Sequence, residues 1–166
     1  IKNFISGVKE SGEIHAILHC VGSFAVRPPH AMNKEAFEAV ISTNLTSAFL
    51  TLSIAGKAML SQGHGRMVFM SSVAGSLGLV NHEAISAAKG GIESMVRSAA
   101  ATYANRGLRI NAVAPGLTDT KLASPIMSNE TASQAASQKI PIKRVGRKEE
   151  VANVIKWLLT EAPENF

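Results

Sequence analysis

The chain has 166 residues, of which 46% are hydrophobic and 17% are charged. This length and balance suffice for one domain with a sizeable core and exclude a disordered polypeptide. The net charge is +5, but no stripe of Lys and Arg interleaved with aromatic residues is present, so nucleic-acid binding is not expected.

The first half of the chain predicts a helix, a strand, a long helix and a second strand. A helix is expected over residues 1–10, and the apolar run IHAILHC, residues 14–20, has the length of a strand. Asn33 is the expected N-cap of a helix over 33–61. After two glycines, RMVFMSS at 66–72 predicts the next strand.

The second half repeats the alternation. A long helix is expected over 83–105, and LRINAVA at 108–114 is the third strand. Residues 121–139 are expected to form short helices in a mobile flap, and 149–160 a last helix.

Strands that alternate with helices indicate an α/β fold with a parallel sheet and right-handed crossovers. The strands are apolar with little alternation, which is typical of a sheet covered by helices on both faces. Ligands of such sheets bind beyond the carboxyl ends of the strands. Three polar or glycine-rich loops are expected there, at Gly22, at Ser71-Ser72 and at Pro115-Gly116.

Five motifs occur in a specific order: HCVG, ISTN, GRMVFMSSVAG, AISAAKGG and RINAVAPGLTDT. From about Gly12 to Glu161, this order resembles the short-chain dehydrogenase/reductase family, and within it the 3-oxoacyl-(acyl-carrier-protein) reductase-like branch. The resemblance implies a Rossmann-like doubly wound parallel sheet, of which about three strands with flanking helices are present. Residues 1–166 are then the C-terminal portion of a single Rossmann domain. The glycine-rich opening turn and the last strand of the family are missing, so we expect a piece of a longer protein.

The resemblance assigns three residues to catalysis. Asn44 matches the helix asparagine that anchors a proton-relay water, and Ser72 matches the serine that stabilises the reacting carbonyl. Lys89 matches the lysine that holds the nicotinamide ribose and lowers the pKa of a tyrosine one turn away. That tyrosine is expected thirteen residues after Ser72, but Ile85 stands there.

Isoleucine cannot donate a proton, and general acid catalysis typically contributes about 10²–10⁴-fold. Tyr103 is the only tyrosine and lies about 27 Å further along the helix, too far to substitute. His82, about one helical turn before Ile85, is an alternative candidate for the general acid.

The cofactor implied by the resemblance is NADP or NAD, because the segment that distinguishes them is absent. Gly22 and Lys89 match cofactor-binding positions of the family. The stretch Pro115, Gly116, Thr118 and Thr120 matches the loop that holds the nicotinamide carboxamide.

Three function classes remain open. The first is an oxidoreductase that acts on a ketone, a 3-oxoacyl group or a secondary alcohol. The second is a catalytically impaired relative, with Ile85 in place of the tyrosine, that serves as a nucleotide-binding or structural subunit. The third is an interaction module that binds no nucleotide.

The expected partners are a small carbonyl or alcohol substrate and a second copy of the chain. The helices 33–61 and 83–105 would form a homodimer or homotetramer, as they do in this family. The single cysteine, Cys20, fits a cytoplasmic location. No apolar run long enough for a membrane is evident, and no metal is expected, because His15 and His19 have no third ligand at metal-site spacing.

Overall fold

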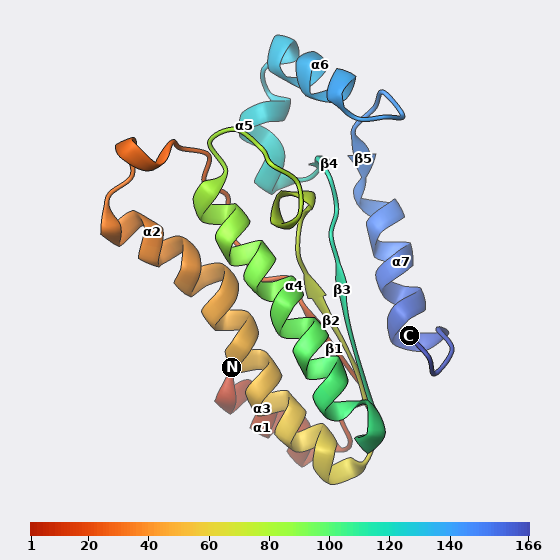
Figure 1. Ribbon diagram of the computed structural model, residues 1–166. Helices are drawn as coiled ribbons and strands as arrows, with labels where there is room; N and C mark the ends of the chain where they lie inside the picture. Colours follow the sequence, from red (N-terminus) through yellow and green to blue (C-terminus); the bar gives the residue numbers. More distant parts are fainter.

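The computed structural model describes residues 1–166, and its centre is a three-stranded parallel sheet (Figure 1). The strands are β1 (Ala16–His19), β2 (Gly65–Met70) and β3 (Leu108–Val113), in the spatial order β1-β2-β3. Each expected strand is present, and the parallel pairing confirms the α/β class.

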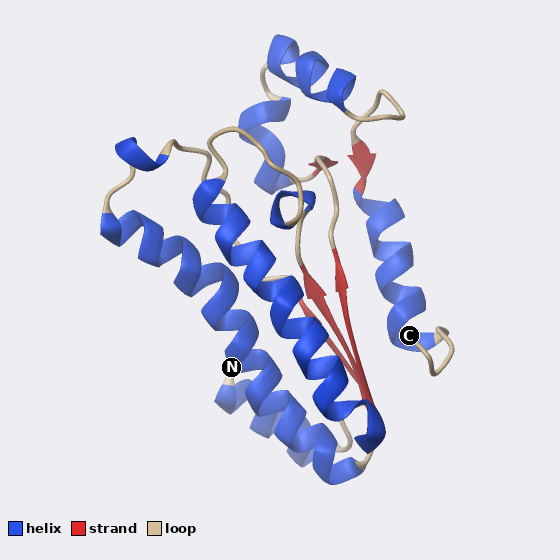
Figure 2. Ribbon diagram, viewed as in Figure 1, coloured by secondary structure: helices blue, strands red, loops and turns tan.

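Helices cover both faces of this sheet, as a doubly wound fold requires (Figure 2). One face packs against a layer that includes α3 (Ser47–Gln62) and α4 (Glu83–Tyr103), with α1 (Lys2–Ser11) beside α3. The other face packs against α7 (Lys148–Thr160). The helices expected at the two ends of the chain are thus confirmed.

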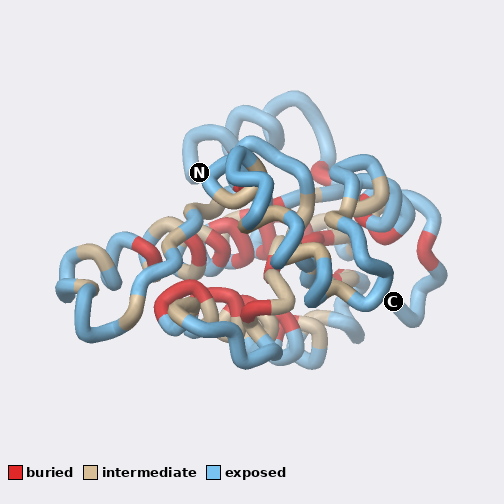
Figure 3. Tube along the Cα trace, turned by 90° about the horizontal axis from the view of Figure 1, so that it is seen from above, coloured by how far each residue is buried: buried red, intermediate tan, exposed pale blue.

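The central strand supplies side chains to both layers. Met67 and Phe69 are fully buried in the core beneath α3 and α4. Val68, between them, belongs to the core beneath α7. In Figure 3 the buried stretches run through the middle of the molecule, and exposed chain forms its outer edges.

The helix expected over 33–61 is continuous but not uniform. It begins at α2 (Lys34–Ile41), where the Asn33 side chain accepts a hydrogen bond from the Ala36 amide at 2.9 Å, as expected of an N-cap. A π-helical segment, Ser42–Thr46, then joins α2 to α3. Gly63 ends α3 with φ 80°, a left-handed conformation that glycine adopts without strain.

The expectation that no segment of the chain is long and apolar enough to cross a membrane is wrong for this helix. Lys34–Gln62 spans 29 residues and is, by length and composition alone, long and apolar enough to cross a membrane. Individual Ser, Thr and Lys residues hide this when the sequence is read for an uninterrupted apolar run. The observation is weak evidence for a membrane, because Ala48, Ala55 and Met59 are buried in the core, and core helices have the same composition.

The carboxyl ends of the strands point toward the end of the molecule that carries α5 (Ser124–Met127) and α6 (Glu130–Lys139) (Figures 1 and 2). These are the short helices expected between 121 and 139. A small parallel pair, β4 (Thr118–Asp119) with β5 (Gly146–Arg147), joins the two ends of this region. The sequence did not predict this pair.

Candidate active site

Gly22, Asn44 and Lys89 meet beyond the carboxyl end of β1. A β-carbon at position 22 would lie 2.9 Å from Oδ1 of Asn44 and 3.6 Å from Nζ of Lys89. Residues from a loop, the α2–α3 junction and α4 therefore share one neighbourhood. Only a residue without a side chain fits between the amide and the ammonium.

Asn44 is fully buried in the π-helical segment, and both nitrogen and oxygen of its amide are hydrogen-bonded. Its Nδ2 donates to the carbonyl of Val40 at 2.9 Å and to Oγ of Ser23 at 3.0 Å. Its Oδ1 accepts from the Ser23 amide at 3.2 Å. A side chain that competes for backbone hydrogen bonds disfavours a regular helix interior. Asn44 thus ties the loop after β1 to the irregular turn between α2 and α3.

Lys89 is buried, and its Nζ donates to the carbonyl of Met70 at 2.7 Å. Burial lowers the pKa of the Lys89 ammonium below its ordinary value, and the nearby Cys20 opposes this shift. The lysine is therefore fixed at the end of β2, beside Gly22.

Lys89 also influences His19, the last residue of β1. Burial lowers the pKa of the His19 imidazole, and the positive charge of Lys89 lowers it further. The two ring nitrogens lie 3.1 Å from Oγ1 of Thr51 and 3.1 Å from Oγ of Ser47. A neutral His19 therefore fastens β1 to α3 next to the candidate site.

The two serines after β2 have different surroundings. Ser71 is buried and donates toward the carbonyl of Lys89 at 3.1 Å and toward Oε1 of Glu93 at 2.8 Å. Ser72 is partly exposed, and its Oγ accepts from the Ala74 amide at 3.2 Å. Ser71 thus holds the strand end against α4, whereas Ser72 is less buried and its Oγ accepts only the bond from the Ala74 amide.

The loop after β3 lies beside the loop that carries Ser72. The Val73 amide donates to the carbonyl of Pro115 at 3.0 Å, and the Ser71 amide donates to the carbonyl of Val113 at 2.8 Å. Gly116 follows at the surface.

The two threonines lie further along the chain. Thr118 is part of β4 and donates from Oγ1 to the carbonyl of Gly116 at 3.1 Å. Thr120 is exposed and precedes a 3-10 turn. No hydrogen bond joins either threonine to Asn44, Ser72 or Lys89.

Comparison with known proteins places this geometry in a family. A family model described as enoyl-(acyl carrier protein) reductase matches residues 1–164. The chain belongs to the short-chain dehydrogenase/reductase family.

Three relatives illustrate the membership. The chain is 42% identical over 135 residues to the cis-4-hydroxycyclohexanecarboxylate dehydrogenase of Sinomonas cyclohexanicum, covering 81% of this chain and 53% of that protein. It is 36% identical over 158 residues to the 3-oxoacyl-[acyl-carrier-protein] reductase MabA of Mycobacterium bovis, covering 95% of this chain and 63% of that protein. A solved tyrosine-to-phenylalanine variant of ElxO with NADPH bound has a TM-score of 0.92 at 26% identity, covering 99% of this chain and 68% of that one. The chain therefore spans between half and two thirds of the length of the two curated relatives.

Ile85 departs from the tyrosine of this short-chain dehydrogenase/reductase pattern and is only 4% exposed. It packs in a small cluster with Val40, Ala74, Ala84 and Ala88. The nearby His82 lies just before α4, and its Nδ1 donates to the carbonyl of Val80 at 2.7 Å. This bond leaves Nε2 of His82 available for another partner.

Sequence reasoning missed three residues that shape this site: Ser23, Glu93 and Gly75. Gly75 lies against α4, since a β-carbon there would lie 3.0 Å from the Gly90 amide nitrogen and 2.8 Å from Oε1 of Glu93. The pair Gly90-Gly91 after Lys89 was a signal in the sequence that another part of the backbone packs closely against this part of α4. Nothing in the sequence pointed to Ser23 or Glu93, because their roles depend on hydrogen bonds across the fold.

Proposed function

We propose that the intact protein is an oxidoreductase that transfers hydride between NAD(P)(H) and a ketone, a 3-oxoacyl group or a secondary alcohol. The observation that carries the proposal is the buried ammonium of Lys89 beside Gly22 and Asn44. Burying a charge is costly unless it is hydrogen-bonded, and Lys89 has a single carbonyl partner, that of Met70. A ligand with hydroxyl groups would supply further oxygen atoms to which this ammonium can donate.

Each matched residue has a role that fits its surroundings. Lys89 would bind ribose hydroxyls, and the absence of a side chain at Gly22 would let the nucleotide approach the end of β1 closely. The hydroxyl of the partly exposed Ser72 would orient the substrate carbonyl. Pro115, Gly116, Thr118 and Thr120 would hold the carboxamide of the cofactor, which supplies the hydride.

The proton has no obvious donor in this chain. Ile85 cannot supply it, so a water molecule or Nε2 of His82 would have to do so. The Nδ1 bond to Val80 orients the ring, and because Nδ1 carries the hydrogen of that bond, Nε2 can give up a proton only when His82 is the doubly protonated imidazolium.

A second candidate function is nucleotide binding without turnover, as the inactive subunit of an assembly. The close packing of Ile85 favours it. In ElxO, a structural relative, NADPH is bound in a variant with a tyrosine replaced by phenylalanine, which supports nucleotide binding without a tyrosine hydroxyl. In both functions we place the protein in the cytoplasm as a homodimer or homotetramer. Phe49 and Leu50 on α3 are 56% and 43% exposed, as expected of residues that a second copy covers.

The deciding experiment measures binding and turnover separately. Calorimetry with NADPH and NADH tests binding, and cofactor oxidation with a panel of ketones and 3-oxoacyl thioesters tests turnover, for the wild type and for Ile85→Tyr. We expect binding in both proteins and turnover that rises by about 10²–10⁴-fold in the variant. Binding without turnover in either protein would establish the second function. No binding by the wild type would contradict both.

Because Tyr is larger than Ile, the variant can fail to pack at the buried position 85. His82→Gln provides an independent measurement, since His82 lies in the loop before α4 and is only partly buried. If His82 is the acid, this variant binds NADPH like the wild type but loses turnover. Unchanged turnover would leave water as the proton source.

A further inference from the structure

A second group of polar side chains lies at the opposite, amino-terminal edge of the sheet. Ile14 is 3% exposed, whereas its neighbours Glu13 and His15 are exposed. In an extended chain, alternate side chains point to the same side. Burial of Ile14 therefore directs Glu13 and His15 together toward solvent.

The backbone of this segment is fixed by Gln62 at the end of α3. The Ile14 amide donates to Oε1 of Gln62 at 3.0 Å, and Nε2 of Gln62 donates to the carbonyl of Ile14 at 3.1 Å. Two hydrogen bonds to one residue determine both its position and its orientation. Glu13 and His15 thus extend from a defined stretch of chain rather than from a free loop.

His64 reaches the same place from the loop before β2. It lies between Gly63 and Gly65, and the Arg66 amide donates to the carbonyl of His15 at 3.0 Å. The rings of His15 and His64 are stacked, with centroids 5.2 Å apart and planes inclined by 16°. Nε2 of His64 lies 3.2 Å from Oε2 of Glu13.

One ligand atom from each of these three residues lies within 4.8 Å of the other two. A tetrahedral zinc ion with bonds of about 2.0–2.1 Å needs ligand atoms roughly 3.3 Å apart. The two imidazoles would also have to turn out of their nearly parallel stack so that their in-plane lone pairs converge on the ion, and the partial exposure of all three side chains leaves room for this. Two imidazoles with one carboxylate and a water are a set that zinc uses, whereas Mg²⁺ and Ca²⁺ prefer oxygen ligands.

We propose that Glu13, His15 and His64 bind a divalent transition-metal ion, for which Zn²⁺ is the best match. The ion would join the segment before β1 to the loop before β2, at the edge of the sheet away from Asn44 and Lys89. It would stabilise the folded protein, because the unfolded chain does not hold the three ligands together. This inference does not depend on the proposed oxidoreductase function.

Thermal unfolding with and without Zn²⁺ tests the proposal. A hundredfold excess over Kd raises the Tm by roughly 5–10 °C for a chain of this size. We expect this rise in the wild type with Zn²⁺ and none with Mg²⁺. The rise should be lost in His64→Ala and in His15→Ala, both at exposed or partly exposed positions where substitution alone has little effect on stability.

The matched control is His30→Ala, which removes an exposed histidine outside the cluster and should keep the full rise. Cys20→Ser should keep it as well, because this exposed thiol, the only cysteine of the chain, lies outside the cluster. Calorimetry should give one Zn²⁺ per chain in both controls and none in His64→Ala. No rise in the wild type, or an equal rise in His64→Ala, would overturn the proposal.

Discussion

Gly22 and Asn44 are packed so closely that a β-carbon at position 22 would lie 2.9 Å from Oδ1 of Asn44. The asparagine cannot give way easily, since its amide is bound to Ser23 and Val40. We therefore predict that Gly22→Ala destabilises the protein by about 1–3 kcal/mol, as overpacking of a filled site does. Urea unfolding measures the effect.

The control for Gly22→Ala is Gly78→Ala. A β-carbon at Gly78 would meet nothing within 4 Å, and its backbone is not left-handed. That variant should unfold at the urea concentration of the wild type within error. Equal stability of the two variants would show that the contact between Gly22 and Asn44 relaxes freely.

Replacing Lys89 by methionine should change how stability depends on pH. Burial lowers the pKa of Lys89 below 10.5, so the unfolded chain binds more protons than the folded protein between the lowered value and 10.5. Stability therefore rises with pH across that window. Compared with Lys89→Met, the wild type should gain stability between about pH 7 and pH 10. Urea unfolding of both proteins at the two values measures the gain, and parallel curves would contradict the prediction.

His19 should titrate at a lower pH than an unperturbed histidine. Burial and the charge of Lys89 both lower its pKa below 6.5, so the unfolded chain takes up its proton first as the pH falls. The stability that neutral His19 contributes is present above about pH 6.5 and decreases as the pH falls toward the folded-state pKa. Histidine ring resonances followed by NMR, with His19→Asn for assignment, measure the midpoint. A midpoint at or above 6.5 would contradict the packing described for β1 and α3.

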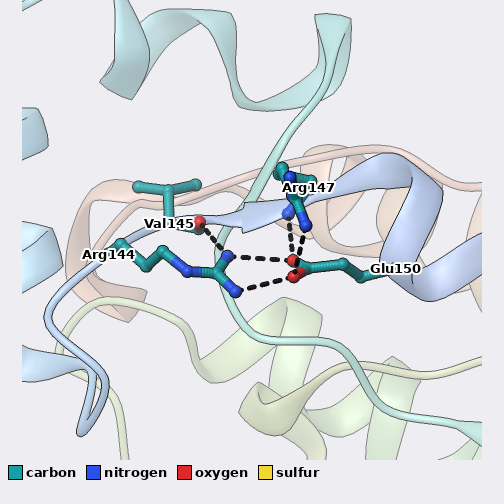
Figure 4. Close-up of polar contacts among 4 residues, drawn as sticks. All are labelled: Arg144, Val145, Arg147 and Glu150. Atoms are coloured by element: carbon teal, nitrogen blue, oxygen red, sulfur yellow. Dashed lines mark hydrogen bonds and ion pairs between the residues drawn. The ribbon is translucent and has the colours of Figure 1, made fainter.

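Glu150 on α7 binds two arginines of the segment that joins α6 to α7 (Figure 4). Arg144 donates to Oε1 at 2.6 Å and to Oε2 at 2.9 Å, and the Arg147 amide donates to Oε2 at 2.8 Å. The hydrogen bond from Arg144 is the main cause that lowers the pKa of Glu150 to about 2. The stability that the Glu150 carboxylate gives to this segment should be fully present above about pH 4.5 and should be lost as the pH falls toward 2.

Hydrogen exchange of residues 144–150 at about pH 5 and pH 3 measures this stability. Glu150→Gln should show fast exchange at both values once the intrinsic pH dependence is subtracted. Glu149→Gln is the control, because its carboxylate has only one distant contact, at 3.9 Å from Nζ of Lys148. If Glu149→Gln exchanged as fast as Glu150→Gln, the stability of this segment would not come from the carboxylate of Glu150.

Local patterns were enough to predict the regular elements. The N-cap at Asn33 and the long α4 were found because capping and helical spacing are encoded within a few residues. The π-helical turn at Asn44 was not found, since it changes hydrogen bonding without changing the apolar pattern. The pair β4–β5 was missed because two residues per strand carry no periodicity.

The same limit applies to the sites. Asn44, Ser72 and Lys89 were selected through a family resemblance, and the structure brings Asn44 and Lys89 together at Gly22. Glu13, His15 and His64 were not selected, because a separation of about fifty residues hides a cluster that the parallel pairing of β1 and β2 creates. His19, which was considered with His15, is buried and bound to α3 instead.

The alternation of Met67, Val68 and Phe69 between two cores has a consequence for engineering. Neighbouring positions of one strand belong to separate layers, so substitutions beneath α7 and substitutions beneath α3 and α4 share few contacts. Effects at sites without shared partners are close to additive. Stabilising substitutions could therefore be selected separately in a library of the α7 layer and in a library of the opposite layer. The selected substitutions could then be combined without testing every pair.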